Sequence, residues 1–328
     1  MVNASGVVVC GRGLVGLSTA IYCRLAGYQV TVLDRVDPGS RRQASFGNAG
    51  TLAIYGNPPI PAPGLIWQVP GMLANKDSPL SLKMTPHLLR MTPWLLQLLR
   101  ACPAEKNEAS AAALGVLLNS AIDAYGIIWE KAGIRVGDDL LRHEGSLYLY
   151  SSPKTFAGSE REVRLRRESG IRVEELNKEQ IKELEPNLAP VYHKGLFFPD
   201  AMNVTDPGRL TQRLDALFQE LGGRVHYGHA AKLEPLQQGG VKVHLSEGSP
   251  IEGKRVVVAC GAHSKTLSDS LGEHIPLDTE RGYHIRFPGE PPIRRPVGWA
   301  DIGFYMTPMD GGLRTAGTVE LGGLDAPS

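Results

Sequence analysis

Three glycines lie close together near the start of the chain, within the stretch VVVCGRGLVGLSTA at 7–20. Gly11, Gly13 and Gly16 have the spacing G-x-G-x-x-G, after a β-branched run that favours a strand and before residues that favour a helix. In this motif the glycines allow a tight turn, a close approach of the backbone to a pyrophosphate, and close packing of the helix on the strand. Free N–H groups at the start of the helix face the anion. The spacing therefore predicts a dinucleotide-binding turn.

An acidic residue stands where the second strand of such a unit ends. We expect a helix from about Leu14 to Ala26, a stop at Gly27, and a strand over 29–33. Asp34 follows that strand, and its carboxylate can accept hydrogen bonds from ribose hydroxyl groups. It would repel a 2′-phosphate, although the neighbouring Arg35 keeps NADP as an alternative. Strand, turn, helix and acid together favour a bound dinucleotide over a turn that serves packing alone.

Composition and periodicity predict the elements farther along the chain. The stretch 41–71 is rich in Gly, Pro and Asn and predicts an extended loop, and the strongly charged stretch 160–185 predicts a solvated helical excursion. Helices are expected at about 86–100, 109–132 and 207–221, and strands at 144–152, 241–245 and 255–260. From 276 onward we expect antiparallel strands, with a turn at 310–312.

The charges of the chain are balanced, with 35 basic and 34 acidic residues, so no broad field of one sign favours nucleic acid or an anionic membrane. The four cysteines, Cys10, Cys23, Cys102 and Cys260, are too scattered for a disulfide framework, and no Cys/His cluster predicts a metal site. Glycines interrupt the apolar N-terminal run, which carries no Lys or Arg before Arg12, so we expect neither a signal peptide nor a spanning helix there. We expect a cytoplasmic protein, at most peripheral to the inner membrane, with small-molecule partners.

The predicted dinucleotide is FAD. An NAD dehydrogenase would complete its first half with alternating strands and helices, whereas this chain enters a Pro-rich loop after the second strand. The sequence has no second G-x-G-x-x-G, so a separate NAD(P)H domain is not predicted. A flavin here would take its electrons directly from a substrate.

Further segments accompany the opening unit: ASFGNAG at 44–50, PHLLRMTPWLLQLLRAC at 86–102, VVVACGAHS at 256–264, LDTERGYH at 277–284 and MTPMDGGLRTAGTVELGGLDAP at 306–327. Together they resemble the FAD-dependent amine and amino-acid oxidoreductases of the D-amino-acid oxidase superfamily, most closely its bacterial D-amino-acid dehydrogenase branch. The resemblance implies an α/β fold, in which a Rossmann-like FAD-binding domain is interleaved with a smaller α+β substrate domain built on an antiparallel sheet. We place the FAD-binding domain at 1–85 and 205–272, and the helical excursion and substrate domain at 86–204 and 273–328.

The resemblance also implies which residues hold FAD. Those at the pyrophosphate are Gly11, Gly13, Leu14, Val15, Gly16, Cys260, Gly261 and Ala262. Those at the adenosine are Asp34, Arg35 and Ala231, and those at the flavin ring and ribityl chain are Ser45, Asn48, Ala49 and Gly50. The small residues of ASFGNAG would let backbone N–H groups approach a flat ring, although a plain loop is the alternative. Arg12 departs from the small residue that is usual in the turn, so its side chain needs a clear path out.

In this family an amino acid with a neutral amine passes a hydride from its α-carbon to the flavin, and the resulting imine is hydrolysed to a 2-oxo acid and ammonia. The protein must then supply a cation for the substrate carboxylate, for which the planar guanidinium of arginine is best suited. The candidates on the predicted second layer are Arg281, Tyr283, His284, Tyr305 and Arg314. The period of two in strands predicts that about half of them point elsewhere. Tyr283 is the preferred hydroxyl for the substrate and His284 comes second.

The predicted function is oxidative deamination of a D-amino acid or a hydroxyproline-like amino acid, with electrons passed to a carrier or quinone. A glycine- or sarcosine-type oxidase that produces peroxide is an alternative. The family pattern continues beyond Ser328 with a closing FAD segment, so a truncated, non-catalytic flavin-binding protein is a second alternative. The leucine-rich helix at 86–100 would dock at a membrane that carries a quinone, although core packing is favoured. Its apolar residues are Leu88, Leu89, Met91, Leu95, Leu96, Leu98 and Leu99.

Overall fold

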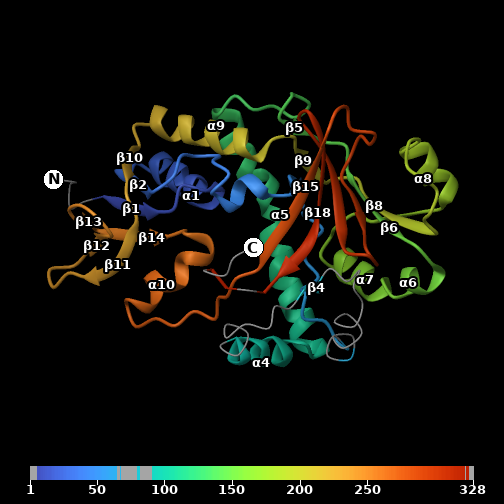
Figure 1. Cartoon of the computed structure of the whole chain (residues 1–328), viewed down its shortest axis with the longest axis horizontal. Helices are drawn as coiled ribbons and strands as arrows, with labels where there is room; N and C mark the ends of the chain where they lie inside the picture. Colours follow the sequence, from blue (N-terminus) through green and yellow to red (C-terminus); the bar gives the residue numbers. More distant parts are fainter. Residues whose placement is uncertain (1–5, 65–66, 68–79, 82–90, 322, 325–328) are drawn as a thin grey trace. The chain divides into compact units, whose positions relative to one another are not determined.

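The computed structural model describes residues 6–64, 67, 80–81, 91–321 and 323–324. The chain forms two compact units, each assembled from three segments (Figure 1). Unit 1 comprises Met1–Asn48, Ile127–Ile134 and Asp206–Asp278, and unit 2 comprises Ala49–Gly126, Arg135–Thr205 and Thr279–Ser328. The units are therefore interleaved along the sequence, as expected.

Unit 1 is built on a parallel sheet with the strand order β10-β2-β1-β14. Its strands are β1 (Val7–Cys10), β2 (Val30–Asp34), β10 (Arg224–Tyr227) and β14 (Arg255–Val258). β1 is fully buried and β2 nearly so, which explains their continuous apolar sequences. α1 (Leu14–Leu25) follows β1 after the glycine turn. The predicted Rossmann-like β-α-β unit is thus present, and the carboxyl ends of its strands meet where α1 begins.

A second helix of unit 1, α9 (Pro207–Glu220), packs against α1. Asp206 caps it by accepting a hydrogen bond from the amide of Arg209 at 3.0 Å. Its buried face carries Leu210, Leu214, Leu217 and Phe218, so the helix is held by apolar burial. The remaining elements of the unit are η1 (Ala44–Gly47), β11 (Ala230–Pro235), β12 (Val241–Leu245), β13 (Ile251–Gly253), η2 (Gly261–His263) and α10 (Ser264–Asp269).

Unit 2 is built on an eight-stranded sheet in the order β15-β18-β17-β16-β6-β8-β7, with β4 beside β18. The strands are β4 (Leu80–Ser81), β6 (Ser146–Tyr150), β7 (Glu174–Leu176), β8 (Lys194–Phe198), β15 (Arg281–Pro288), β16 (Val297–Trp299), β17 (Phe304–Met309) and β18 (Gly312–Glu320). The predicted antiparallel character holds for most pairs, whereas β16 with β6 and β18 with β4 are parallel. β17 and β18 form the predicted hairpin.

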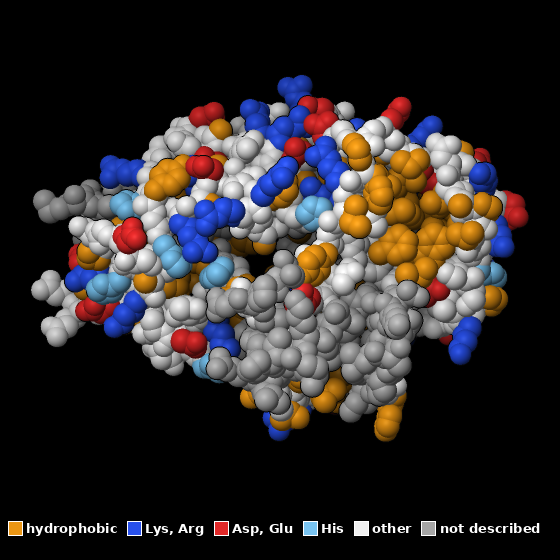
Figure 2. Space-filling model, viewed as in Figure 1, with side chains coloured by type: hydrophobic (Ala, Val, Ile, Leu, Met, Phe, Trp, Pro, Cys, Tyr) orange, Lys and Arg blue, Asp and Glu red, His pale blue; other side chains and the backbone are white. Residues whose placement is uncertain are grey.

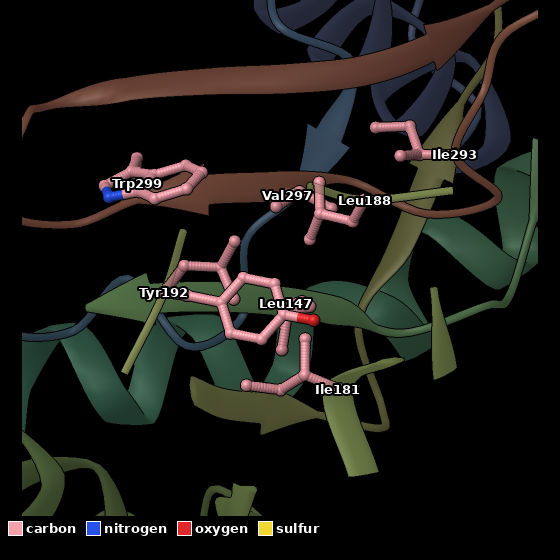
Figure 3. Packing of buried hydrophobic residues seen from close by; sticks show 8 residues of the cluster. Leu147, Ile181, Leu188, Tyr192, Ile293, Val297 and Trp299 are labelled. Carbon is pink, nitrogen blue, oxygen red and sulfur yellow. The ribbon is translucent and has the colours of Figure 1, made fainter. Parts of the chain in front are cut away.

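One face of this sheet carries an apolar core. Leu147, Val297 and Trp299 lie on the sheet, and Ile181 and Tyr192 approach them from the neighbouring segment (Figure 3). Ile181 belongs to α8 (Lys178–Leu184), which begins at a capping box formed by Asn177 and Gln180. Hydrophobic side chains also gather on the surface of unit 2 over β6 and β8 (Figure 2).

The other elements of unit 2 are β3 (Thr51–Leu52), α4 (Thr92–Ala101), α5 (Ala104–Lys131), β5 (Leu141–Arg142), α6 (Pro153–Ala157), α7 (Glu160–Glu168) and β9 (Met202–Val204). The last turn of α5 belongs to unit 1. α5 is long and apolar enough to cross a membrane, because an 18-residue window within it has a mean hydropathy of 1.6. Core helices of soluble proteins satisfy the same two measures, so these measures do not assign α5 to a membrane.

Several local predictions differ from the structure. The charged stretch 160–185 contains the strand β7 between its helices, because β7 adds to the edge of the sheet beside β8. The loop predicted at 41–71 contains η1 and β3, and its residues 65–66 and 68–71 lie outside the described part. Residues 49–64, predicted in the first domain, lie in unit 2, where β3 pairs with β9. Unit 2, expected to be the smaller, is the larger, because the helices α4 to α8 and the eight-stranded sheet belong to it.

Candidate functional site

The glycine turn of unit 1 has no room for side chains at two of its three glycines. Gly11 has φ +110°, and a Cβ there would lie 2.2 Å from the carbonyl oxygen of Ala259. A Cβ on Gly16 would lie 1.9 Å from the carbonyl oxygen of Gly11. The turn therefore needs glycine at both places, because the backbone of β1, α1 and the end of β14 meet there. Gly13 is extended and faces the Ser45 hydroxyl, with a hypothetical Cβ 3.1 Å from Ser45 Oγ.

The amino end of α1 presents donors beside this turn. The amide of Leu14 donates to Ser45 Oγ at 3.2 Å, and the amide of Val15 lies in the first turn, where a helix supplies no backbone acceptor. Val15 itself is 71% exposed, and the first turn contains no acidic residue. The partial positive charge of the helix end is thus left for an anion. Ser45, predicted near the flavin ring and ribityl chain, lies in unit 1 and contacts the amino end of α1.

Asp34 is held in a fixed orientation at the carboxyl end of β2. Its Oδ2 accepts from the amide of Arg12 at 2.7 Å, and its Oδ1 accepts from the amides of Arg35 at 2.7 Å and Val36 at 3.2 Å. A fourth donor, Gln43 Nε2, lies 3.5 Å from Oδ2, so the roughly four acceptor positions of the carboxylate are occupied and a ribose hydroxyl group would replace this longest hydrogen bond. Two glycines that tolerate no side chain, helix amides and an oriented carboxylate together fit the adenosine diphosphate part of FAD.

The remaining candidates of unit 1 lie on two other elements. The pairing of β11 with β12 has a register shift between Ala230 and Lys232. Ala231 therefore has no partner residue on β12 in this ladder. Cys260, at the end of β14, donates its thiol to the carbonyl oxygen of Cys10 at 3.2 Å. Burial raises the pKa of Cys260 to about 11 and that of Cys10 to about 12, so both thiols are protonated at neutral pH. Gly261 and Ala262 follow in η2.

The sequence reasoning missed a histidine close to Asp34. Burial, followed by the positive charges of Arg35 and His263, lowers the pKa of His229. Its Nδ1 lies 3.1 Å from Ser246 Oγ. The signal for this residue is its position directly between β10 and β11, next to the residues predicted at the adenosine.

Unit 1 also has a cavity of about 230 Å³, which lies away from the glycine turn. Its walls include Gly6, Val7, Arg24, Val30 and Glu252, which stand at the amino ends of β1 and β2 and on the elements around them. Ligands of open α/β sheets bind at the carboxyl ends of the strands. The cavity is therefore at the wrong end of the sheet for the dinucleotide.

Two of the predicted flavin contacts begin unit 2, and one of them packs against its large sheet. Asn48 ends unit 1, and Ala49 and Gly50 start unit 2. Gly50 has φ +74°, and a Cβ there would lie 2.5 Å from the carbonyl oxygen of Val204 and 2.8 Å from Met309 Cε. Gly50 thus lies against the end of β17.

Three of the five substrate candidates share one face of this sheet. His284 of β15 and Tyr305 of β17 are both opposite Ala316 of β18, and directly opposed residues point to the same face. Arg314 is two residues from Ala316 and therefore joins them. We call His284, Tyr305 and Arg314 the arginine face. Met309, which Gly50 contacts, alternates in phase with Tyr305 on β17, so Gly50 packs against the same face.

Packing and charge shape the arginine face. A Cβ on Gly298 would lie 2.7 Å from the Tyr305 ring, so glycine leaves the space for that ring. The Tyr148 ring lies edge-on, with its centroid 5.3 Å away. Arg314 is buried, and His284 lies at the exposed β15. Partial desolvation, followed by the positive charge of Arg314, lowers the pKa of His284, which favours the neutral imidazole.

The other two candidates, Arg281 and Tyr283, lie on the opposite face of β15. Both are an odd number of residues from His284, so they point to the other face. Gly282 pairs with Val319 and His284 pairs with Ala316, so β18 has one extra residue there and the register shifts. The Tyr283 hydroxyl donates to the carboxylate of Glu320, and Arg281 Nη1 lies 4.0 Å from Glu320 Oε1. The structure therefore brings His284, Tyr305 and Arg314 together and separates Arg281 and Tyr283 from them.

Comparisons with known proteins give a consistent result. Residues 6–328 match the model of a family described as FAD dependent oxidoreductase. The chain is 33% identical over 321 residues to the D-amino-acid oxidase of Bradyrhizobium diazoefficiens, covering 98% of this chain and 75% of that protein. It is 29% identical over 324 residues to the D-amino acid dehydrogenase of Vibrio vulnificus, covering 97% and 76%. The glycine oxidase structure from Geobacillus kaustophilus has a TM-score of 0.64 at 18% identity, over 97% of this chain and 71% of that one.

Proposed function

Since the chain belongs to the family of FAD-dependent oxidoreductases, with FAD as its cofactor, we propose that it oxidises the C–N bond of a D-amino acid or a hydroxyproline-like amino acid. The similarity to proteins named D-amino-acid oxidase and D-amino acid dehydrogenase supports this substrate class. The observation that carries the proposal is the arginine face, where a buried guanidinium, a histidine with a lowered pKa and a tyrosine lie on the face that Gly50 contacts.

FAD would be held by the glycine turn, the amino end of α1 and the carboxylate of Asp34. Bound FAD supplies the acceptor for the hydride that leaves the substrate α-carbon. The substrate loses this hydride and an amine proton. Water then hydrolyses the imine of a primary amino acid to a 2-oxo acid and ammonia, whereas the cyclic imine of a hydroxyproline-like substrate keeps its nitrogen in the product.

The residues of the arginine face have separate tasks in this proposal. Arg314 binds the substrate carboxylate, because its planar guanidinium can donate two parallel hydrogen bonds in a site with little water. Neutral His284 accepts the proton of the substrate ammonium group, which frees the amine lone pair. Tyr305 bounds the space beside them, where its ring is fixed by Gly298 and Tyr148. Arg281 and Tyr283 adjoin the Glu320 carboxylate on the opposite face of β15. They would act on the substrate only if Glu320 did so as well.

We further propose that the electrons leave to a carrier or quinone, in a cytoplasmic protein that is peripheral to the inner membrane. Exposed apolar side chains on two helices of unit 2 support this proposal. Leu96 of α4 is 50% exposed, and Val116 and Leu117 of α5 are 73% and 67% exposed. Of the leucine-rich residues predicted for docking, Met91 is fully buried, and Leu88 and Leu89 lie outside the described residues.

The test is an anaerobic flavin titration of the purified protein. D-alanine, D-proline, hydroxyproline, glycine and sarcosine are added separately, and the visible flavin absorbance is followed. L-alanine and L-proline are the matched controls for the two D-amino acids. Bleaching by a D-amino acid or hydroxyproline, followed by faster reoxidation with a quinone analogue than with oxygen, is the expected result. Bleaching by glycine or sarcosine alone, with peroxide formed in air, would assign the protein to the glycine-type oxidases. Retained flavin that no amino acid bleaches would make it a binding protein instead.

A further inference from the structure

The arginine inside the glycine turn is not on the surface. The side chains of Arg12 and its partner Asp215 are only 4% and 6% exposed. Arg12 Nε donates to Asp215 Oδ1 at 2.5 Å and Nη2 donates to Asp215 Oδ2 at 2.7 Å, so the pair is bidentate. Nη1 donates to the Tyr227 hydroxyl at 3.0 Å. The side chain that departs from the usual small residue is thus packed between α9 and β10.

These contacts distinguish two possible roles for Arg12. A phosphate-binding arginine needs donors that reach the anion, whereas three of the five N–H groups of this guanidinium donate to Asp215 or Tyr227 and the side chain is only 4% exposed. Its charge is also compensated by the Asp215 carboxylate. Burial lowers the pKa of Arg12, but hydrogen bonds to Asp215 and Tyr227 outweigh this effect and raise it overall, so Arg12 stays charged. Arg12 is therefore placed to hold the turn rather than to bind the pyrophosphate.

The backbone of Arg12 connects this pair to the ribose-binding carboxylate. Its amide donates to Asp34 Oδ2 at 2.7 Å, and its carbonyl oxygen accepts from Gln43 Nε2 at 3.2 Å. Tyr227 is the neighbour of Asp34 in the sheet register. A shift of Arg12 would therefore move the amide that orients Asp34 and would disturb the adjacent Gly11, where a Cβ would lie 2.2 Å from the carbonyl oxygen of Ala259.

Loss of either charged partner would disturb this arrangement strongly. Without Arg12, the buried carboxylate of Asp215 keeps only the hydrogen bond from Gln219 Nε2 at 2.7 Å. A buried charge without its partner costs more than the pair contributes, so α9 or the turn must move to admit water. We propose that Arg12, through Asp215, is a positioning residue that sets the glycine turn and Asp34 for the adenosine diphosphate half of FAD. This inference depends on FAD as the cofactor and not on the amino-acid substrate.

The chain offers a matched control on the same helix. Arg24, near the carboxyl end of α1, also links α1 to α9, since its Nε and Nη2 donate to the carbonyl oxygen of Leu221 at 2.9 and 2.6 Å. It stands at the far end of α1 from the glycine turn. Arg24→Ala should therefore lower stability through the same two helices without reaching the cofactor site.

The experiment measures the Kd of the apoprotein for FAD and for ADP by calorimetry, at a temperature where circular dichroism shows each variant folded. Arg12→Ala and Asp215→Ala should each weaken both ligands about tenfold or more, and the double variant should be no worse than either single one. Arg12→Lys keeps the charge but loses the bidentate geometry, so its Kd values should lie between those of the wild type and of Arg12→Ala. This variant also allows the test to be made if the alanine variants do not fold. Arg24→Ala should lower Tm and leave both Kd values within twofold of wild type.

Lower Tm with unchanged Kd values in the Arg12 variants would overturn the proposal, and so would an equal loss of affinity in Arg24→Ala. A wild-type protein that binds FAD but oxidises no amino acid would refute the proposed function and leave this inference intact.

Discussion

The glycine turn of unit 1 and the arginine face of unit 2 would recognise their proposed ligands by different means. The turn relies on the backbone: positive φ at Gly11, helix amides, and a carboxylate fixed by three backbone N–H groups. The arginine face relies on side chains from three strands, which the sheet register brings together. Backbone recognition is encoded within one short stretch of sequence, whereas side-chain recognition depends on pairing between distant segments. Changes at the two places should therefore separate cofactor binding from substrate oxidation.

The largest effect is expected at the turn. Gly16→Ala would place a Cβ 1.9 Å from the carbonyl oxygen of Gly11, so the turn must open and the purified protein should lose its flavin absorbance. Gly126→Ala is the matched control, because a Cβ there meets nothing within 4 Å and alanine favours the helix α5 by about 1 kcal/mol. A Gly16→Ala variant that keeps stoichiometric flavin would show that the turn is not the cofactor site.

A substitution on the arginine face should have the second-largest effect and should spare the flavin. Arg314→Lys keeps the charge but loses the planar fork, and kcat/KM should fall ~10- to 100-fold because a charged hydrogen bond to the substrate is lost. Steady-state kinetics with the best substrate provides the measurement. Arg172→Lys is the control, since that exposed side chain pairs with Asp200 and lies just before β7, at the opposite edge of the sheet from β15 and β18. Equal losses in both variants would mean that Arg314 has no special role.

The opposite face of β15 should respond more weakly. Tyr283→Phe removes the hydroxyl that donates to Glu320, and kcat/KM should fall about twofold to tenfold with the flavin content intact. The same kinetic assay distinguishes two results. Unchanged kinetics would remove Tyr283 from the site, whereas a loss larger than that of Arg314→Lys would move the substrate site to the Glu320 side.

The smallest effect is a shift in pH dependence. Because the pKa of His284 is lowered, its neutral, proton-accepting form persists to a more acidic pH than for a free histidine, and the acid limb of kcat/KM should lie below pH 6.5. Arg314→Met removes one of the two causes of this lowering, so the acid limb should move to higher pH. A pH profile of the residual activity checks this. An acid limb at the same pH in both proteins would exclude His284 as the group that titrates.

The difference between the two regions also explains how far the sequence could be interpreted. The first strand and the start of α1 near Leu14 were predicted correctly, because the glycine spacing, the β-branched run and the helix signals are all local. The five substrate candidates could be placed on strands but not sorted between faces. One extra residue in β18 fixes how β15 pairs with it, and no local signal marks that residue. The partner of Arg12 was equally out of reach, since Asp215 lies about 200 residues away on α9.

The central claim is that unit 1 holds FAD while the arginine face of unit 2 selects the substrate. The most direct test is the visible spectrum of the Arg314→Met variant, recorded before and after anaerobic addition of the amino acid that bleaches the wild-type protein. A full flavin spectrum that fails to bleach at the wild-type rate is the predicted result. A colourless variant, or one that bleaches as fast as the wild type, would contradict the claim.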